Sequence, residues 1–352
     1  VGVEIPHYCY HPKLSAPGNC RMCSIHIANA QFPDRPYPMS CITPARQYKD
    51  RDGNEFPMEI ITDNEQLSKM RKDIMEFLLI NHPLDCPQCQ QSGICELQNY
   101  AYDYGPNTSR FTEPKNQRHR KSLGTHVSIF GNRCIACDRC SRFTDEISGT
   151  GELTLVNRGD SSVIDVIPGF ELNNPMSLNT VDICPVGALL SKDFLYKARP
   201  WFLEPIATIC ADAKGSNVYI DVHDGKIQRI RPRQNDEVNE TWLADRDRLY
   251  YRWVNDKNRL RFCQVEGTEV GSREALAKAG EVLQKIATDN QGEQTALLGG
   301  AWSVNEELFL LAELGDALSV PAAHRFARKH PDGEQWIAKS GFRIEADRNP
   351  NV

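Results

Sequence analysis

The stretch Cys134-Ile135-Ala136-Cys137-Asp138-Arg139-Cys140 places three cysteines at successive gaps of two residues. A fourth cysteine, Cys184, follows after residues 141–183 and directly precedes Pro185. Three evenly spaced thiolates completed by a remote Cys-Pro are typical of four-iron clusters, whereas zinc knuckles rarely use such a triplet. We call these four cysteines the third set, because two other sets precede them, and we expect them to bind a 4Fe-4S cluster.

The second set combines one imidazole with three thiols and has the spacing His82-x3-Cys86-x2-Cys89-x5-Cys95. These ligand types fit either a four-iron cluster with one unusual ligand or a zinc ion. Taken alone, the spacing favours zinc. A histidine ligand changes the charge of a cluster, as it does in Rieske centres, where it raises the reduction potential.

The first set has the spacing Cys9-x10-Cys20-x2-Cys23-x17-Cys41 and lies among turn residues such as Pro17-Gly18-Asn19. Four thiolates can close a two-iron cluster, with three on one loop and the fourth returning from a distance. The first gap departs from the plant-type spacing of C-x4-C-x2-C. A zinc ribbon with four cysteine ligands is the alternative, because zinc accepts the same ligands.

The composition favours metal sites over disulfides and over nucleic-acid binding. Eleven of the 13 cysteines lie in the first 184 of 352 residues, and the total is odd. Local Cys-x2-Cys spacing without a secretory context indicates metal binding. The net charge of −6 gives no reason to expect nucleic acid, and no apolar run reaches the ~18 residues that a membrane span needs. Three sets in tandem suit single-electron transfer, and the third set favours iron for the other two.

The periodicity predicts a mixed α+β chain of several domains. A helix is expected from Asn64 to Asn81, with Pro83 ending it. Short strands are expected at 127–130, 153–156 and 163–167, and a hairpin over 217–231 around His223-Asp224-Gly225. A strand at 295–298 between helices at 272–288 and 305–318 indicates the beginning of an α/β domain.

In this order and with these gaps, the three sets resemble the large iron–sulfur subunit, of the G or 75 kDa type, of proton-pumping NADH:quinone oxidoreductase, respiratory complex I. The most specific parts are the second set and the segment Asp182-Ile183-Cys184-Pro185-Val186-Gly187-Ala188-Leu189. The resemblance covers essentially the whole chain, including Asp347-Arg348-Asn349-Pro350-Asn351 near its end. We expect both ends to be incomplete, because residue 1 is Val and no closing element follows.

The resemblance implies three clusters and four domains. The first set would hold a 2Fe-2S cluster, and the second and third sets would each hold a 4Fe-4S cluster. The domains would be a partial ferredoxin-type 2Fe-2S domain (1–48), a helical 4Fe-4S domain with one histidine and three cysteine ligands (49–122), a 4Fe-4S domain closed by Cys184 (123–200) and a partial molybdopterin-oxidoreductase-like α/β domain (201–352).

The resemblance also implies partners and a location. Electrons would arrive from the flavin subunit, which binds NADH, and leave toward the quinone-side iron–sulfur subunits, so no NAD or flavin site and no catalytic residue is expected in this chain. The chain would lie in the peripheral arm of the respiratory-chain enzyme, without a membrane span of its own and without nucleic acid. That arm faces the cytoplasm in bacteria and the matrix in mitochondria.

One departure from the family pattern concerns a further four-iron cluster that some members bind with C-x2-C-x3-C and a distant cysteine. Cys210 is the only cysteine near that place, and the other ligand positions correspond to Ala213, Asn217 and Ala244. One thiolate cannot hold a four-iron cluster, so we expect this cluster to be absent and Cys210 and Cys263 to be ordinary small apolar residues. No molybdopterin is expected either.

Two alternatives remain open from the sequence. NAD-linked hydrogenases and formate dehydrogenases resemble the first two sets, but they usually continue with a pair of tight cysteine triplets. A zinc-stabilised scaffold without a redox role is the alternative from another class. Arg21 and Arg133 adjoin candidate ligands and either stabilise a reduced cluster or are solvated arginines. His7, His11 and His26 are expected to be surface or hydrogen-bonded residues.

Overall fold

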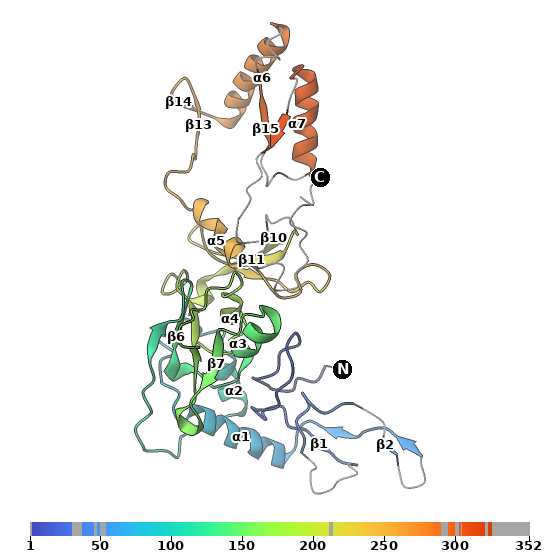
Figure 1. The fold of residues 1–352 in the computed structure, drawn as a ribbon, viewed down its shortest axis with the longest axis vertical. Helices are drawn as coiled ribbons and strands as arrows, with labels where there is room; N and C mark the ends of the chain where they lie inside the picture. The colour runs from blue at the N-terminus through green and yellow to red at the C-terminus, as the bar shows by residue number, and fades with distance from the viewer. Residues whose placement is uncertain are drawn as a thin grey trace. The chain divides into compact units, whose positions relative to one another are not determined.

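The computed structural model describes residues 2–29, 37–45, 48–49, 54–210, 214–289, 295–299, 303, 305–320 and 323–325 (Figure 1). They divide into two compact units, which we describe separately. One unit is drawn from Val1–Ile206, Ile220–Arg231 and Trp242–Leu249, and the other from Ala207–Tyr219, Pro232–Thr241 and Tyr250–Val352. None of the helices among the described residues has both the length and the apolar character that crossing a bilayer requires.

Among the described residues up to Ile61, regular structure is limited to short strands. Strand β1 (His26–Ile27) pairs antiparallel with β4 (Ile60–Ile61), and β2 (Tyr48–Lys49) pairs antiparallel with β3 (Glu55–Phe56). Each strand has two residues. The loop that carries the first three cysteines is nevertheless well anchored, because the side chains of Tyr8 and Met22 are completely buried.

Two helices frame the second set. Helix α1 (Glu65–Leu79) begins where the sequence predicts, since the side chain of Asn64 accepts a hydrogen bond from the N–H of Leu67. It buries Leu67 and Met75 and ends just before the second set. Helix α2 (Glu96–Tyr104) starts directly after Cys95, which is its N-cap residue. The second set therefore occupies the connection between these two helices.

A small antiparallel sheet supports the third set. Its order is β5 (Arg120–Ser122), β6 (Val127–Phe130) and β9 (Leu189–Ser191). Between β6 and β9 the chain forms the short helical segments η1 (Gly131–Arg133), α3 (Arg139–Arg142), the π-helical turn η2 (Phe143–Ile147), η3 (Gly159–Ser161) and α4 (Asn179–Asp182). Strands β7 (Leu153–Val156) and β8 (Val163–Val166) pair as a hairpin. The strands predicted at 127–130 and 153–156 are confirmed, and the third ends one residue early.

The predicted hairpin over 217–231 is also confirmed. Strands β11 (Asn217–His223) and β12 (Lys226–Pro232) form a three-stranded sheet with β10 (Glu204–Ile209), in the order β10-β11-β12. The turn residues Asp224 and Gly225 both have positive φ angles, as a tight two-residue hairpin turn requires. The short helical segments η4 (Pro200–Phe202) and α5 (Asp245–Leu249) belong to the first unit.

The second unit contains the start of an α/β arrangement. Strand β15 (Leu297–Gly299) is followed by α7 (Asn305–Ala317) and then by β16 (Ala323–Arg325), which pairs parallel to β15. The hairpin of β13 (Cys263–Val265) and β14 (Thr268–Val270) precedes α6 (Ser272–Thr288), and η5 (Tyr250–Trp253) lies upstream. Both helices appear where they were predicted. The family segment 347–351 lies outside the described residues.

Candidate metal centres

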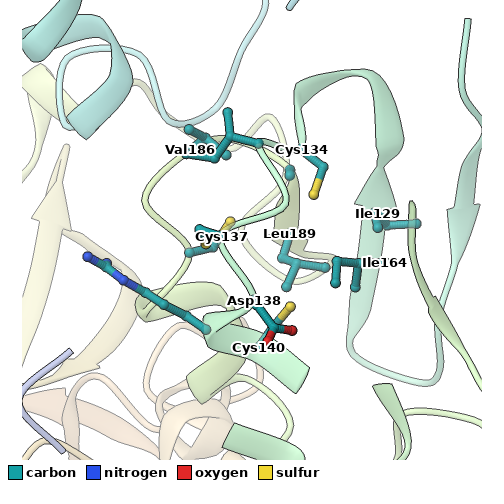
Figure 2. A pocket seen from close by; sticks show the side chains of 12 residues that line it. Ile129, Cys134, Cys137, Asp138, Cys140, Ile164, Val186 and Leu189 are labelled. Atoms are coloured by element: carbon teal, nitrogen blue, oxygen red, sulfur yellow. The ribbon is translucent and has the colours of Figure 1, made fainter. Parts of the chain in front are cut away.

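The four thiols of the third set line a single cavity. Cys134 and Cys137 come from the loop between η1 and α3, Cys140 lies in α3, and Cys184 comes from the turn before β9. Apolar side chains complete the wall, among them Ile129, Ile164, Val186 and Leu189 (Figure 2). The strands β6, β8 and β9 supply most of these residues, so the sheet and hairpin position the third set. The structure thus brings together all four residues that the spacing predicts.

The sulfurs of the third set are spread around the cavity, an arrangement that a cluster can use. Figure 2 shows the sulfurs of Cys134, Cys137 and Cys140 standing apart around it. A 4Fe-4S cluster takes its four thiolates at separate irons, whereas zinc holds its ligands about 2.3 Å from one point. Within the described ranges, no group of three or more His, Cys, Asp or Glu side chains is arranged to hold one metal ion.

Burial controls the protonation of the third set. It raises the pKa of Cys134 to about 11 and also raises the pKa of Cys137, Cys140 and Cys184. Backbone N–H groups of Leu189, Val186 and Ala188 act in the opposite direction on Cys184. Without a cation these thiols are protonated at neutral pH, so a metal that binds them must displace their protons. The sulfurs of an iron–sulfur cluster accept hydrogen bonds from backbone N–H groups such as these.

His82 of the second set carries an unsatisfied buried nitrogen. Its Nδ1 has no hydrogen-bond partner among the described residues, and the ring lies just beyond the end of α1. Burial, together with the positive charges of Arg133 and Lys115, lowers the pKa of His82 to about 4. The imidazole is therefore neutral at pH 7, the form in which histidine binds metals. Both observations fit a ligand role.

The cysteines of the second set differ in exposure. Cys89 and Cys95 are buried and Cys86 is exposed. Burial raises the pKa of Cys95 to about 11, and the neighbouring thiols Cys89 and Cys184 add to this effect. The second set thus lies within electrostatic reach of the third set.

The thiols of the first set lie together in two hydrogen-bonded pairs. Cys9 shares a hydrogen bond with Cys20, and Cys23 shares one with Cys41. The bond from Cys9, supported by backbone N–H groups, lowers the pKa of Cys20 to about 5. Burial and the bond to Cys23 raise the pKa of Cys41 to about 12. Four sulfurs with backbone donors around them fit a two-iron cluster.

The arginines and histidines near the ligands can now be assigned. Arg133 is buried and binds the carboxylate of Asp85 at 2.9 Å, so it is not a solvated arginine, whereas Arg21 is exposed. Three histidines are engaged elsewhere: His7 contacts the carbonyl of Ile5, His11 packs on Trp242, and His26 stacks on Tyr37.

Two further arginines, the buried Arg139 and the half-buried Arg142, also contact candidate ligand loops. Sequence reasoning did not find them, because only their position beside the cysteine triplet distinguishes them from surface arginines.

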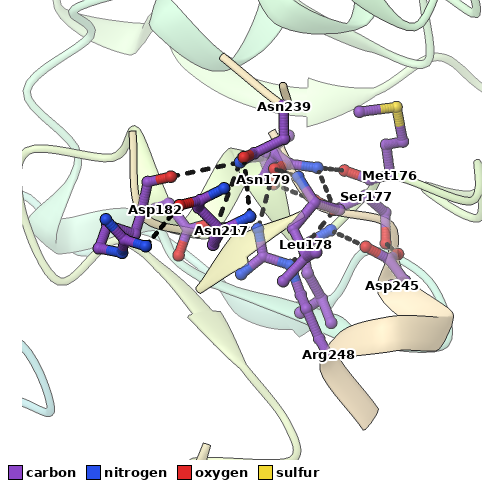
Figure 3. Close-up of polar contacts among 12 residues, drawn as sticks. Met176, Ser177, Leu178, Asn179, Asp182, Asn217, Asn239, Asp245 and Arg248 are labelled. Carbon is purple, nitrogen blue, oxygen red and sulfur yellow. Dashed lines mark hydrogen bonds and ion pairs between the residues drawn. The ribbon is translucent and has the colours of Figure 1, made fainter. Parts of the chain in front are cut away.

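A hydrogen-bond network holds the segment that leads to Cys184. Asp245 accepts hydrogen bonds from the hydroxyl of Ser177 and the N–H of Leu178 (Figure 3). Asn179 donates to the carbonyl of Leu243, and Arg248 bonds both Asn179 and Asp182. Hydrogen bonds to Leu243, Asp245 and Arg248 thereby hold the segment that precedes Cys184 in place.

The place of the further four-iron cluster offers one thiol, from Cys210, and one amide, from Asn217. Cys210 donates its N–H to the carbonyl of Ser216 at 2.7 Å. Asn217 accepts a hydrogen bond from Arg233 and donates its N–H to the side chain of Asn239 (Figure 3). Ala244 has no ligating atom, and Ala213 lies outside the described residues. The described residues do not fit a four-iron cluster here.

Three family models match the chain. Residues 71–110 match the NADH-ubiquinone oxidoreductase-G iron-sulfur binding region, and residues 124–190 match the ferredoxin-like domain of NADH-quinone oxidoreductase subunit 3. Residues 207–252 match the 4Fe-4S domain described as NADH-ubiquinone oxidoreductase NDSU1/NuoG-like. The first two matches contain the second and third sets, and the last contains Cys210 as its only cysteine.

Curated relatives match most of this chain. The G subunit of the NADH-quinone oxidoreductase of Rickettsia felis is 38% identical over 89% of this chain and 45% of its own length. The corresponding protein of Rickettsia prowazekii is 43% identical over 88% and 44%. The mitochondrial NADH dehydrogenase [ubiquinone] iron-sulfur protein 1 of Solanum tuberosum is 38% identical over 89% and 41%.

The chain therefore spans less than half the length of these relatives. Among solved structures, an NAD+-reducing [NiFe]-hydrogenase aligns with 28% identity over 55% of this chain and 78% of that chain, at a TM-score of 0.46.

Proposed function

We propose that this chain belongs to the family of the large iron–sulfur subunit of NADH-quinone oxidoreductase and that it is an electron-transfer subunit of complex I. The observation that carries the proposal is the cavity lined by the four thiols of the third set. Iron–sulfur clusters, when bound, supply one-electron transfer. The chain's own residues supply thiolates, one neutral imidazole, backbone N–H donors and an apolar wall that excludes water.

We propose the following ligands. A 2Fe-2S cluster is held by Cys9, Cys20, Cys23 and Cys41. One 4Fe-4S cluster is held by His82, Cys86, Cys89 and Cys95, and a second by Cys134, Cys137, Cys140 and Cys184. The domain limits 1–48, 49–122, 123–200 and 201–352 accompany this assignment. The proposal includes no fourth cluster, because Cys210 is the single thiol at that place. It also includes no molybdopterin.

The partners follow from the same proposal. The flavin subunit that binds NADH would donate electrons to this chain, and the quinone-side iron–sulfur subunits would accept them. The chain would then lie in the peripheral arm, on the cytoplasmic side in bacteria or the matrix side in mitochondria. The family matches support complex I over an NAD-linked hydrogenase or formate dehydrogenase, and the single triplet of the third set favours the same choice.

Metal analysis and electron paramagnetic resonance (EPR) of the dithionite-reduced chain, purified anaerobically with cofactor assembly intact, test this function. We expect about ten irons per chain and three paramagnetic species, one from a two-iron and two from four-iron clusters. About three zinc ions without a paramagnetic signal would establish the zinc scaffold instead. About fourteen irons would show that a fourth cluster forms despite the single cysteine.

A further inference from the structure

Three arginines beside the cysteine triplet reach from the third set to the other two sets. Arg133 precedes Cys134, Arg139 precedes Cys140, and Arg142 lies two residues after Cys140. Their side chains are only 5%, 6% and 10% exposed. A cation that is removed from water must gain compensating contacts, and each arginine finds them beside candidate ligands.

Arg142 joins the first set to the third. Its Nη2 donates to the carbonyl of Cys9 at 2.5 Å and to that of Cys137 at 3.4 Å. Its Nη1 donates to the carbonyl of Ser15, and its Nε donates to that of Asp138 at 3.1 Å. All four acceptors are backbone carbonyls, and two of them belong to candidate cluster ligands.

A second contact supports the same junction. Glu146, in the turn η2 that follows Arg142, accepts hydrogen bonds from the N–H of Ser15 at 2.8 Å and from its hydroxyl. The segment between the first two cysteines of the first set is thus held by one cation and one carboxylate from the helical turn after the triplet. The two sets are fixed to one another through this turn.

The charge of Arg142 is only weakly neutralised. The carboxylate of Asp138 lies 3.9 Å from its Nε, at the outer limit of an ion pair. Arg133 and Arg139, in contrast, bind Asp85 and Glu96 with shortest N–O distances of 2.9 and 3.3 Å. A cation that bonds neutral carbonyls and has no close carboxylate partner keeps its full charge, and in a poorly hydrated place that charge exerts a strong field on nearby groups.

We propose that Arg142 is a positioning residue that fixes the first set against the third and raises the reduction potential of both. The inference rests on the proposed function, because it presupposes clusters in these two sets. Reduction adds one negative charge to a cluster, and a buried cation beside it favours the reduced form. Among the described residues, Arg142 makes no hydrogen bond to the second set, so we expect the potential of that set to depend least on this arginine.

Arg139 provides a matched control within the same helix. Its Nη1 donates to the carbonyl of Ile183, next to Cys184, and its guanidinium pairs with Glu96, next to Cys95. Arg139 therefore makes hydrogen bonds beside the third and second sets and makes no described hydrogen bond to the first, although its charge acts on His11 in the first-set loop. Arg139→Gln and Arg142→Gln each remove one positive charge from the same helix. Arg142 makes its hydrogen bonds beside the first and third sets, whereas Arg139 makes its own beside the second and third.

An EPR-monitored redox titration of the full chain, with all clusters assembled, tests the proposal. In Arg142→Gln, the ratio of reduced to oxidised species at the wild-type midpoint falls about tenfold for the first and third sets, which corresponds to about 59 mV for one electron. The second set keeps its midpoint. In Arg139→Gln, the midpoint of the first set shifts less than it does in Arg142→Gln. Arg142→Lys keeps the charge and restores most of the potential while altering the line shape of the two signals.

The outcomes separate the inference from the proposed function. Absence of iron from the wild-type chain removes the proposed function and this inference with it. Wild-type signals with unchanged midpoints in Arg142→Gln overturn the inference alone. Equal shifts or losses of all three signals also overturn it, because they show a general effect on folding. If Arg142→Gln loses only the first-set and third-set signals, and Arg142→Lys retains both, the positioning role of Arg142 is supported.

Discussion

Gly187 lies directly against the sulfur of Cys89, so that a Cβ atom on this glycine would overlap that sulfur. Gly187 follows Cys184 in the turn that closes the third set, and Cys89 belongs to the second. The same turn accepts a hydrogen bond at its Pro185 carbonyl from the N–H of Glu96, at 3.0 Å. The second and third sets therefore share one wall of backbone.

This contact makes Gly187→Ala a selective probe of the second set. The backbone of Gly187 does not adopt a left-handed conformation, so the added methyl group acts through its clash with the Cys89 sulfur. We expect the EPR signal of the second set to be lost or strongly changed while the third-set signal remains. Gly280→Ala, in helix α6 with open space around the glycine, is the control and should change neither signal. An unaltered second-set signal in Gly187→Ala would refute the shared wall.

Lys115 closes the helix end from which His82 projects. Its Nζ donates to the carbonyls of Leu79 at 2.9 Å and Ile80 at 2.7 Å, and α1 has no basic residue in its last turn. The N–H of Asn116 binds the side chain of Asn81 at 3.0 Å. A cation at a helix C-terminus satisfies carbonyls that lack partners inside the helix.

We therefore expect Lys115→Met to loosen the position of His82. The predicted result is a broadened second-set EPR signal with unchanged first-set and third-set signals, and a cost of about 0.3–1 kcal/mol in the free energy of unfolding. His82→Ala should abolish the second-set signal and leave the other two. Lys121→Met, which removes a lysine bound to Asp165, is the control. A Lys115→Met spectrum identical to wild type would exclude the positioning role.

The elements that the sequence could predict are those with a local physical signal. Helix α1 has a capping asparagine, apolar residues at helical spacing and a proline beyond its end. The hairpin β11–β12 has Asp224-Gly225 at its turn. Helix α2 lacks such signals, since its N-cap is Cys95 without a side-chain hydrogen bond. The two-residue strands are too short to show any periodicity.

The ligand sets could be proposed from spacing, but their mutual contacts could not. Arg142 is separated from Cys9 by 133 positions and meets its carbonyl only through the tertiary fold. The contact between Gly187 and Cys89 likewise joins two irregular loops. Irregular loops have no period that relates one to another, so their meeting depends on packing that the sequence does not reveal locally. The sequence also left open whether Arg133 is solvated, and only its burial in the folded chain shows that it is not.

Removal of iron should unfold the region before α1 first. The strands β1 to β4 have two residues each, so bound metal supplies much of the free energy that orders this region. After chelation and oxidation, we expect loss of native circular dichroism and rapid proteolysis within the first 100 residues. Helices α6 and α7 carry none of the sets, and their proteolytic fragments should be unchanged. A native spectrum after complete iron loss would contradict this dependence.

Asp221 and Asp245 are buried carboxylates whose surroundings shift their pKa values in opposite directions. Burial alone would raise the pKa of Asp221, but hydrogen bonds and charge from Arg231 and Arg229 lower it below its ordinary value. The stabilisation from its ionised form is complete above the unfolded pKa of about 3.9 and is lost as the pH falls through the lower folded pKa. At neutral pH the charge of Asp221 therefore stabilises the fold.

For Asp245 the sign is reversed. Burial raises its pKa above the ordinary value, although Ser177 and the N–H of Leu178 donate to it. Its stabilising contribution is complete below the unfolded pKa and is lost as the pH rises through the folded pKa. At neutral pH the ionised side chain thus carries a cost, which a neutral amide of the same shape avoids.

The two isosteric variants should consequently differ in stability. We expect Asp221→Asn to lower the free energy of unfolding by about 1.5–3 kcal/mol at pH 7, the range for hydrogen bonds to charged groups, and Asp245→Asn to lower it by less. Between pH 6 and pH 8 the deficit of Asp221→Asn should stay constant, because Asp221 is ionised throughout. Anaerobic denaturant unfolding followed by circular dichroism measures both. A larger loss in Asp245→Asn than in Asp221→Asn would show that the burial cost of Asp245 is outweighed by its hydrogen bonds.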